Sequence, residues 1–382
     1  MPRITIDNRS IEVPAGTTIL AAARAAGIDI PTLCFLEDLP PQTSCMVCVV
    51  KVDGGARLVP SCAMPVRDGM HVESETDEVR AARRTALELL LSDHLGDCIA
   101  PCQAACPAHL NVPLVIRQVA DGAISDATQT IRDRIALPGV LGRICPAPCE
   151  KACRRAGKDH AVSICLLHRY AADAAAALPR PVVPPCRPAT GKSVGIVGAE
   201  AAGLAAAFYL LRDGHECTLF DEHDRPGGLL RQAVPESRLP RNVLDDNIAV
   251  IRRMGAAFCP RTRVDSPAEL QDRFDAIIVA TGTASKAQGE QPGRNVFLAG
   301  GPAGSAKMAV RALAAGRTAA LAASRFLAGL PAAPQEHEFS THIGHMEPAE
   351  LSVFATGASE TDRVSPADTL CGFTKEEARA EA

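Results

Sequence analysis

Hydrophobic and polar residues alternate at the start of the chain with the period of two that is typical of a half-buried β-strand. Residues 3–7 (RITID) and 10–13 (SIEV) both alternate in this way and predict a β-hairpin. Thr17 then opens an alanine-rich run, TILAAARAAG, which predicts a capped helix that stops at Gly27. Two further strand-like runs, CVVKV and RLVP, follow this helix. These elements predict a small α+β domain over residues 1–78.

The pattern changes to a helical period after this first domain. A charged segment leads into a helix that ends with LELLLSDH. Asn111 then caps an amphipathic helix with Pro113 in its first turn, and residues 123–136 form a second amphipathic helix. We therefore expect a small helical domain over residues 79–178.

A proline-rich segment, LPRPVVPPCRPATGK, separates this helical domain from an α/β pattern. KSVGIVG predicts a buried strand, residues 201–213 a helix, and ECTLFDE a second strand that is closed by Asp221. This βαβ order is typical of the opening of a dinucleotide-binding fold. We expect the α/β domain over residues 190–330, followed by a polar tail, residues 331–382, that wraps the surface.

The net charge and the length of the apolar segments argue against a nucleic acid partner and against a membrane span. The longest apolar stretch, residues 308–330, is interrupted by Arg311, Arg317 and Arg325, so it predicts an amphipathic helix and no membrane span. The formal net charge is −4, from 40 Lys and Arg against 44 Asp and Glu, and no basic field indicates a nucleic acid partner. The N-terminus, MPRITIDNRS, does not resemble a signal peptide. We therefore expect a cytoplasmic protein with reduced thiols.

Cysteine is the residue type that indicates chemistry. The chain has 15 cysteines, and eleven of them precede residue 166. The first set has the pattern C-x10-C-x2-C-x13-C and consists of Cys34, Cys45, Cys48 and Cys62. Four anionic, soft ligands around a loop suit a [2Fe–2S] cluster, and a structural zinc ion is the alternative.

With the hairpin and helix before it, this cysteine loop resembles the N-terminal [2Fe–2S] domain of the large iron–sulfur subunit of respiratory complex I and of some hydrogenases and formate dehydrogenases. The resemblance implies a ferredoxin-like β-grasp fold. The first gap is wider than in the plant-type spacing C-x4-C-x2-C. In those subunits a His-x3-Cys cluster motif comes next, and His94 with Cys98 has that spacing.

Two cysteine triplets with a four-residue step lie in the predicted helical domain: Cys98, Cys102 and Cys106, and then Cys145, Cys149 and Cys153. Prolines at positions 101, 107, 146 and 148 interrupt both triplets and predict compact loops rather than buried helix stripes. The spacing differs from the C-x2-C pairs of zinc sites. It is closer to the cysteine runs of bacterial iron–sulfur proteins, in which a proline follows the last cysteine.

Three segments, GDCIAPCQAACPAHLNVP, LPGVLGRICPAPCEKACRR and AVSICLLHRYAAD, resemble the N-terminal double [4Fe–4S] domain of the glutamate synthase small subunit and of dihydropyrimidine dehydrogenase. The resemblance implies one cluster on Cys102, Cys106, Cys145 and Cys149, and a second cluster that keeps Cys98 and Cys153. The remaining ligands of the second cluster stay open among Cys165, His94 and His168, the last at the position of the non-cysteine ligand of dihydropyrimidine dehydrogenase. A complex I-like alternative groups His94, Cys98, Cys102 and Cys106 instead.

The α/β segment resembles the FAD domain of glutamate synthase-like flavoproteins. The resemblance rests on GAEAAGLAAA, DRPGGLLRQAVPESRLPRNVLDDNI, DAIIVATGT and VFLAGGPAGSAKMAVRALAAGR. It implies a cofactor frame made of Gly198, Glu200, Gly203, Asp221, Gly227, Gly228, Thr281 and Gly282. FAD is therefore a candidate cofactor.

Three departures from that family oppose a bound dinucleotide. Glu200 replaces the middle glycine of the fingerprint, and a carboxylate about 4 Å from a phosphate would cost on the order of 4 kcal/mol at an effective dielectric of about 20. The closing Gly-Asp of the family is Gly301-Pro302 here. Only about a dozen residues join ATGT to VFLAGG, so the inserted NAD(P)H-binding domain is missing.

The sequence thus predicts a multidomain protein of α+β and α/β parts: a β-grasp domain, a small helical iron–sulfur domain and a truncated Rossmann-like flavoprotein domain. It offers no substrate pocket of its own. The first hypothesis is an electron relay with one [2Fe–2S] and two [4Fe–4S] clusters, which serves partner subunits of hydrogenase, formate dehydrogenase, or aldehyde or acyl-CoA oxidoreductase type. The second is a flavoenzyme that still binds FAD, like the glutamate synthase small subunit. The third is a zinc-rich structural adaptor.

Overall fold

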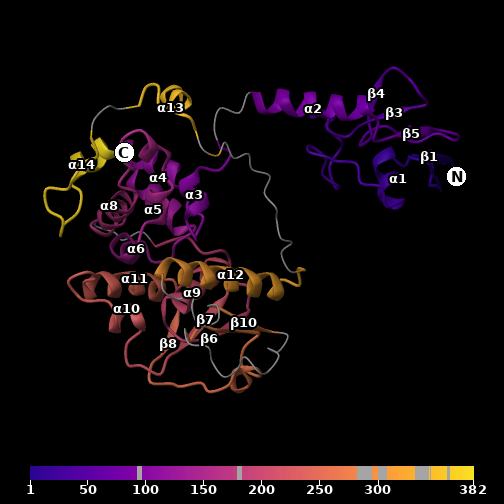
Figure 1. The fold of residues 1–382 in the computed structure, drawn as a ribbon. Helices are drawn as coiled ribbons and strands as arrows, with labels where there is room; N and C mark the ends of the chain where they lie inside the picture. The colour runs from indigo at the N-terminus through magenta and orange to yellow at the C-terminus, as the bar shows by residue number, and fades with distance from the viewer. Residues whose placement is uncertain are drawn as a thin grey trace. The chain divides into compact units, whose positions relative to one another are not determined.

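The computed structural model describes residues 1–92, 97–178, 183–281, 295–299, 308–331, 344, 346–358 and 362–382 (Figure 1). The chain divides into two compact units, Met1–Gly96 and Asp97–Ala382. Four residues that the sequence analysis singled out lie outside the described residues: His94, Gly282, Gly301 and Pro302.

The first unit contains a five-stranded mixed sheet. Its order is β2-β1-β5-β3-β4, with β1 at Arg3–Ile6, β2 at Arg9–Glu12, β3 at Val49–Val52, β4 at Leu58–Pro60 and β5 at His71–Glu73. β1 pairs antiparallel with β2 and parallel with β5, while β3 pairs antiparallel with β4 and β5. Ile4 and Ile6 of β1 share a buried core with Leu20 of helix α1, Ile19–Ala25. The predicted hairpin, helix and following strands are confirmed.

Two details of this unit differ from the sequence prediction. Helix α1 begins after Thr18, whose Oγ1 accepts a hydrogen bond from the N–H of Ala21 at 3.3 Å, so Thr18 rather than Thr17 is the N-cap. Strand β5 is absent from the predicted elements, because its sequence HVE offers only one apolar residue between two polar ones. β5 nevertheless joins the two halves of the sheet, since it lies between β1 and β3.

Helix α2, Asp77–Ser92, follows the sheet in the chain. Its buried Arg83 donates to the carbonyl of Val49 at 3.0 Å and pairs with Glu75 at 3.1 Å. The helix is therefore tied to the strand that follows Cys48.

The second unit begins with a bundle of short helices that carries the cysteine triplets. Their bounds are α3 Pro101–Ala105, α4 Val112–Ala120, α5 Ile124–Arg132, α6 Pro138–Ile144, α7 Pro148–Lys151 and α8 Ile164–Ala176, with a 3-10 turn at Arg154–Gly157. Asn111 caps α4 as predicted, by accepting the N–H of Leu114 at 3.2 Å. α3, α6 and α7 each begin at a proline, which is favoured there because a first helical residue needs no N–H. Each triplet thus alternates between short helix and loop.

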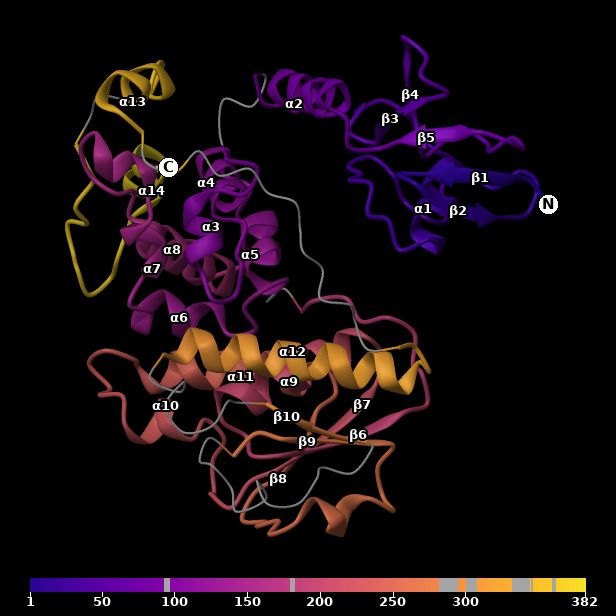
Figure 2. The same ribbon diagram turned by 45° about the vertical axis from the view of Figure 1, so that its right-hand side comes forward.

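The rest of the second unit is built on a parallel sheet in the order β10-β9-β6-β7-β8. The strands are β6 Ser193–Val197, β7 Glu216–Phe220, β8 Ala257–Cys259, β9 Ala276–Val279 and β10 Val296–Leu298. The helices are α9 Ala201–Arg212, α10 Leu229–Gln232, α11 Arg241–Arg253 and α12 Ala309–Leu327, with a 3-10 turn at Pro267–Leu270. Figure 2 shows α9, α11 and α12 between the sheet and the α3–α8 bundle. This region is Rossmann-like, as the βαβ pattern predicts.

The helical bundle and the Rossmann-like region share one hydrophobic core. Buried residues of α6, α8, α9 and α12 belong to a single cluster. The side chain of Asn247 on α11 accepts the N–H of Gly139 on α6 at 3.3 Å. Gly316 lets α12 approach α9 closely, because a Cβ there would lie 2.1 Å from the carbonyl oxygen of Ala202. The two regions therefore support each other through buried apolar surface.

The C-terminal residues also lie on the helical bundle. Helix α13, Pro348–Phe354, precedes helix α14, Lys375–Glu381, which contacts α4 and α8. Phe373 and Ala378 are buried at this contact and belong to the shared core. Within the described part of the chain, no helix is both long and apolar enough to cross a membrane.

Candidate iron–sulfur and dinucleotide sites

In the first unit, the four cysteines of the first set come together around one loop. Cys45, Cys48 and Cys62 are buried, and Cys34 is half-buried. Burial, then the hydrogen bond with Cys48 and the charges of the other thiols, raise the pKa of Cys62 to about 12. Hydrogen bonds from the Cys45 backbone, and less strongly from Ser44, lower the pKa of Cys34 to about 7. N–H donors to sulfur are what an iron–sulfur cluster needs to offset its charge, so these residues fit such a cluster.

The backbone of this loop turns sharply on both sides of Cys45. Thr43 and Met46 have left-handed conformations, with φ of +53° and +55°. Such turns let successive N–H groups face one point. No three His, Cys, Asp or Glu side chains of the described residues converge on the position of a single metal ion. In a [2Fe–2S] cluster each iron atom takes only two of the four thiolates, so a site for such a cluster does not need three sulfurs that converge on one point.

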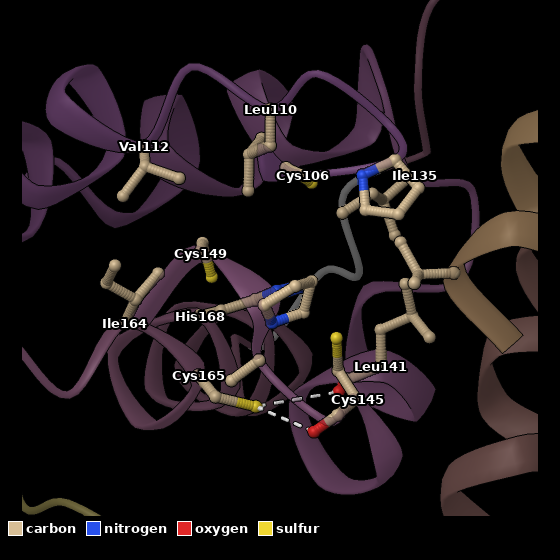
Figure 3. Close-up of a pocket in the computed structure, with 14 residues that line it drawn as sticks. Cys106, Leu110, Val112, Ile135, Leu141, Cys145, Cys149, Ile164, Cys165 and His168 are labelled. Atoms are coloured by element: carbon tan, nitrogen blue, oxygen red, sulfur yellow. Dashed lines mark hydrogen bonds between the residues drawn. The ribbon is translucent and has the colours of Figure 1, made fainter. Parts of the chain in front are cut away.

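In the second unit, thiols from both triplets line one cavity between α4, α6, α7 and α8 (Figure 3). Cys106, Cys145 and Cys149 turn their sulfurs into it, while apolar side chains such as Leu110 and Ile135 form the walls. Burial, then the charge of Cys106, raises the pKa of Cys149. Cys106 and Cys149 are buried and Cys145 is half-buried. Three thiols as close as these become thiolates together only beside a cationic centre, and iron supplies that positive charge.

His168 projects from α8 into the same cavity (Figure 3). It is buried, and this burial lowers its pKa to about 4, so the imidazole is neutral. The carbonyl of Pro138 accepts a hydrogen bond from the ring, whereas Nε2 has no hydrogen-bond partner among the described residues. A metal-ligating histidine has this arrangement, with one nitrogen held by a carbonyl and the other facing the metal.

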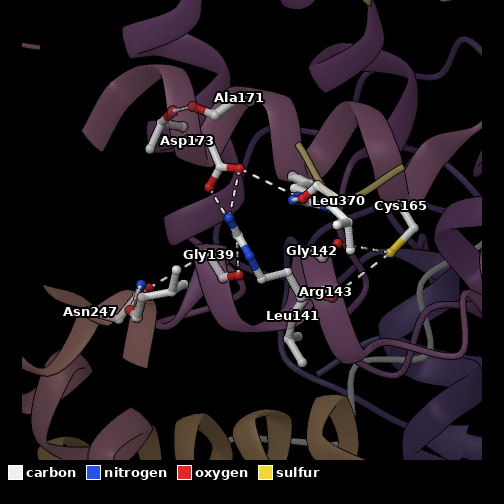
Figure 4. A network of polar contacts seen from close by, with 12 residues as sticks. Gly139, Leu141, Gly142, Arg143, Cys165, Ala171, Asp173, Asn247 and Leu370 are labelled. Atoms are coloured by element: carbon white, nitrogen blue, oxygen red, sulfur yellow. Dashed lines mark hydrogen bonds and ion pairs between the residues drawn. The ribbon is translucent and has the colours of Figure 1, made fainter. Parts of the chain in front are cut away.

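Cys165 also borders the cavity, but its sulfur faces the backbone. Its Sγ contacts the carbonyl oxygen of Gly142 at 3.6 Å and that of Leu141 at 3.8 Å (Figure 4). Burial raises the pKa of Cys165 to about 12. A thiol that donates to carbonyls and resists ionisation has the properties of a buried structural cysteine.

Helix α6 holds this geometry in place. Arg143 on α6 pairs with both oxygens of Asp173 on α8, at 2.8 and 2.9 Å (Figure 4). Gly142 permits a close approach of the two helices, because a Cβ there would lie 2.7 Å from the Cα of Arg169. Cys145, which directly follows α6, is thereby brought beside the helix that carries the histidine.

Cys102 lies outside the group of residues that lines the cavity. Burial raises its pKa, and the charge of Cys153 is the next cause, ahead of that of Cys106. Cys153 is half-buried and Cys98 is exposed. The sequence grouping places Cys102 with the first two cysteines of the second triplet, whereas the structure brings it to the third, because α3 lies against α7.

The loop after β6 has the geometry of a dinucleotide-binding turn. Gly198 has a φ of +99°, and a Cβ there would lie 2.6 Å from the carbonyl oxygen of Ala280. Gly203 lets α9 pass close to this turn, since a Cβ there would lie 1.9 Å from the carbonyl oxygen of Gly198. Asp221 at the end of β7 accepts the N–H of Ala199 at 2.7 Å. These residues meet the backbone demands of the fingerprint.

The half-buried Glu200 side chain lies between the start of α9 and Gly228, a region that we call the dinucleotide crevice. Its side chain reaches from the start of α9 to Gly228 at the start of α10, where a Cβ would lie 2.3 Å from the Cγ of Glu200. Burial, then the charge of Asp221, raises the pKa of this carboxyl group. Gly227, with a φ of +124°, and Thr281 after β9 stand on the neighbouring loops. A pyrophosphate at the α9 N-terminus would meet the carboxylate, so the position of Glu200 opposes the binding of a dinucleotide.

Three domain models match separate parts of the chain. Residues 2–77 match a 2Fe-2S iron-sulfur cluster binding domain, and residues 91–179 match dihydropyrimidine dehydrogenase domain II, 4Fe-4S cluster. Residues 196–255 match an NAD(P)-binding Rossmann-like domain. These matches confirm the iron–sulfur and Rossmann-like resemblances drawn from the sequence.

Three curated relatives each align with about half of the chain or more. The NADPH-Fe(3+) oxidoreductase subunit beta of Geobacter sulfurreducens is 34% identical over 307 residues, which cover 75% of this chain and 43% of the relative. The NADP(+)-dependent formate dehydrogenase subunit beta of Moorella thermoacetica is 36% identical over 53% of this chain and 32% of its own length. The glutamate synthase [NADPH] small chain of Mycobacterium tuberculosis is 35% identical over 52% of this chain and 42% of its own length. The chain thus spans less than half the length of each of these relatives.

Proposed function

We propose that this chain is an iron–sulfur electron-transfer subunit of a multisubunit oxidoreductase, which passes electrons between a partner redox subunit and its own clusters. The observation that carries the proposal is the cavity in which Cys106, Cys145 and Cys149 face His168. Thiolate and imidazole are the ligands that iron–sulfur centres use. The two iron–sulfur domain models and the relatives named as oxidoreductase subunits support the proposal.

The ligands are proposed in three sets. A [2Fe–2S] cluster takes Cys34, Cys45, Cys48 and Cys62, in a domain whose strand order suits a β-grasp fold. An inner [4Fe–4S] cluster takes Cys106, Cys145, Cys149 and His168. An outer [4Fe–4S] cluster takes Cys98, Cys102 and Cys153, and its fourth ligand is unassigned. This scheme differs from the sequence grouping because His168 replaces Cys102 at the inner cluster.

The clusters supply one-electron transfer when bound, and the chain's own residues control their surroundings. The apolar walls of the cavity exclude water from the inner cluster, which strengthens every electrostatic interaction there. The Pro138 carbonyl holds the His168 ring in one orientation. The domain boundaries expected from the sequence, at about residues 78, 178 and 330, are kept in this proposal.

The Rossmann-like region is proposed as a scaffold for the cluster-bearing bundle. Helices α11 and α12 contact α6, and α6 leads directly into Cys145. In the crevice, repulsion between Glu200 and a phosphate is on the order of 4 kcal/mol at a dielectric of about 20, whereas a helix N-terminus returns only about 0.3–2 kcal/mol. Repulsion therefore exceeds the attraction that the turn offers.

A second candidate function is that of an FAD-containing subunit like the glutamate synthase small chain. The retained turn at Gly198 and Gly203, the position of Asp221 and the domain match over residues 196–255 favour it. Under this alternative, the flavin exchanges electrons between a partner subunit and the clusters.

Metal and flavin analysis after anaerobic purification separates the candidates. An electron relay is expected to hold about ten irons per chain and no flavin. An FAD-containing subunit is expected to hold the same irons and one FAD per chain. A structural adaptor is expected to hold zinc instead of iron. Cys45→Ser is expected to remove only the [2Fe–2S] signal in electron paramagnetic resonance. A full chain that takes up no iron, even after anaerobic reconstitution, would contradict the proposed function.

A further inference from the structure

The C-terminal segment, residues 362–382, closes on the start of α8, the helix that carries the histidine of the cavity. The first N–H groups of a helix have no partner within it, and the side chain of Ser163 at the N-cap makes no capping bond. Two carboxylates from other parts of the chain accept these N–H groups instead. Glu381 accepts the N–H of Ser163 at 2.6 Å, and Glu150 accepts the N–H of Cys165 at 2.8 Å. Carboxylates are favourable at this end of a helix.

Arg363 links the C-terminal segment to one of these carboxylates. Its Nε donates to the Oγ of Ser163 at 2.6 Å, and a terminal nitrogen pairs with the second oxygen of Glu150 at 3.0 Å. The Glu150 side chain is 17% exposed and that of Arg363 is 37% exposed. The pair is thus partly shielded, so its charges act on their surroundings more strongly than a surface pair does.

A second contact holds the segment nearly two turns further along α8, six residues after Ser163. Arg169, which directly follows His168, donates to the backbone carbonyls of Thr369, at 3.4 Å, and Leu370. Phe373 and Ala378 are buried in the core that the bundle shares. The segment therefore holds α8 on both sides of the position from which His168 faces the cavity.

Glu150 stands beside the inner cluster's ligands, because it directly follows Cys149 in α7. A negative charge at this place disfavours the addition of an electron to the cluster, and the positive charge of Arg363 opposes that effect. The segment thus brings a balancing charge to the site as well as a mechanical contact.

We propose that residues 362–382 form a clasp that positions α8 at the inner [4Fe–4S] cluster and sets its reduction potential through the Arg363–Glu150 pair. The clasp rests on the proposed electron-transfer function. Reduction adds one electron to the oxidised cluster, and a partner redox subunit, or dithionite in the experiment, supplies that electron. Arg363 is a positioning residue, since it acts through Glu150.

Redox titration of the full chain, followed by electron paramagnetic resonance at one pH, tests the clasp. Arg363→Gln is expected to lower the potential of the inner cluster and Glu150→Gln to raise it, by up to about tenfold in the reduction equilibrium, which is 59 mV for one electron. Gln at position 150 keeps an oxygen for the N–H of Cys165. Arg363→Lys keeps the charge and is expected to restore most of the potential. Arg379→Gln removes an exposed charge of the same segment as a matched control.

Opposite shifts at unchanged iron content, with the control unmoved, would support the clasp. A merely structural contact predicts that both variants shift the potential in the same direction or lose iron together, and either result would overturn the proposal. Potentials of the inner cluster that stay unchanged in both variants would also overturn the proposal. A wild-type chain without any [4Fe–4S] cluster would instead overturn the proposed function, so the two failures are distinguishable.

Discussion

The cluster cavity and the dinucleotide crevice lie in one unit around one hydrophobic core, yet they differ in what fills them. The cavity has an irregular frame of short helices and loops, but thiols and an imidazole point into it. The crevice has the regular frame of a Rossmann-like turn, but the Glu200 side chain occupies it. The difference shows that the backbone geometry of a site and its ability to bind a ligand are separate properties. Packing maintains the frame, while a few inward-facing side chains decide the ligand.

The largest expected effect is the loss of the inner cluster from the cavity. Cys106→Ser and Cys149→Ser each remove a thiolate from the inner cluster, so both should abolish the same paramagnetic signal and release about four irons per chain. Cys102→Ser is the matched variant, because it changes the same triplet outside the cavity. It should spare the inner signal and remove the other [4Fe–4S] signal.

This set of variants distinguishes three ligand schemes. If Cys102→Ser abolishes the same signal as both other variants, the sequence grouping of Cys102 with Cys106, Cys145 and Cys149 is right and the revised one is wrong. If Cys149→Ser spares the signal that Cys106→Ser removes, the complex I-like grouping with His94 holds.

The next effect concerns the two side chains of α8 that compete at the cavity. His168→Ala should change only the inner cluster's signal and make its iron easier to remove with a chelator. The loss of a ligand should weaken binding by at least as much as the loss of an outer-shell partner costs, which is about 10–100-fold. Cys165→Ala should leave signal and iron unchanged, since its sulfur faces the carbonyls of Leu141 and Gly142. Chelation rates and spectra of both variants measure this. The reverse pattern would make Cys165 the ligand.

The third effect tests the crevice side. Glu200→Gly removes the carboxylate that spans to Gly228, and a relief of a few kcal/mol corresponds to about a hundredfold gain in FAD affinity. Flavin fluorescence quenching measures the affinity. Glu200→Gln separates the causes, because it removes the charge but keeps the bulk, and it should gain less than glycine. Stoichiometric FAD in the unchanged protein would contradict the scaffold proposal.

The sequence predicts the helices, strands and turns of both sites better than it predicts which side chains point into them. Periodicity and caps identify the hairpin, the helix that Asn111 caps and the βαβ turn, because these depend on neighbouring residues. The direction of the Glu200 side chain depends instead on Gly228, which comes from another loop. Local patterns carry no signal for such a contact.

The change that we propose in the ligand grouping has the same origin. Cys165 and His168 lie one turn apart on α8, and only the packing of α6 through Gly142 decides that the thiol faces carbonyls and the imidazole faces the cavity. Arg363 and Glu150 are separated by more than two hundred residues, so no local pattern in the sequence indicates their pair. A charged tail residue that contacts a cluster loop has no motif of its own.

The smallest expected effect concerns the frame of the crevice, which packing maintains without a ligand. His215 is buried between the sheet and α12, where Nδ1 lies 2.7 Å from the Oγ1 of Thr190 and Nε2 lies 3.0 Å from the Oγ of Ser324. Burial lowers its pKa below the ordinary value, although Asp213 and Asp275 oppose the shift. The neutral ring is therefore the form that the folded state prefers.

Below a pH of about 6.5 the unfolded chain binds a proton at this histidine more readily than the folded chain does. The stability that His215 contributes is thus fully present above that pH and is lost as pH falls through the folded-state pKa. His215→Gln should lower the free energy of unfolding by about 1–2 kcal/mol at pH 7.5, because two hydrogen bonds are weakened. Urea unfolding of both proteins between pH 5 and 7.5 should show this gap narrowing toward acid. A gap that stays constant or widens would mean that the frame does not depend on a neutral imidazole.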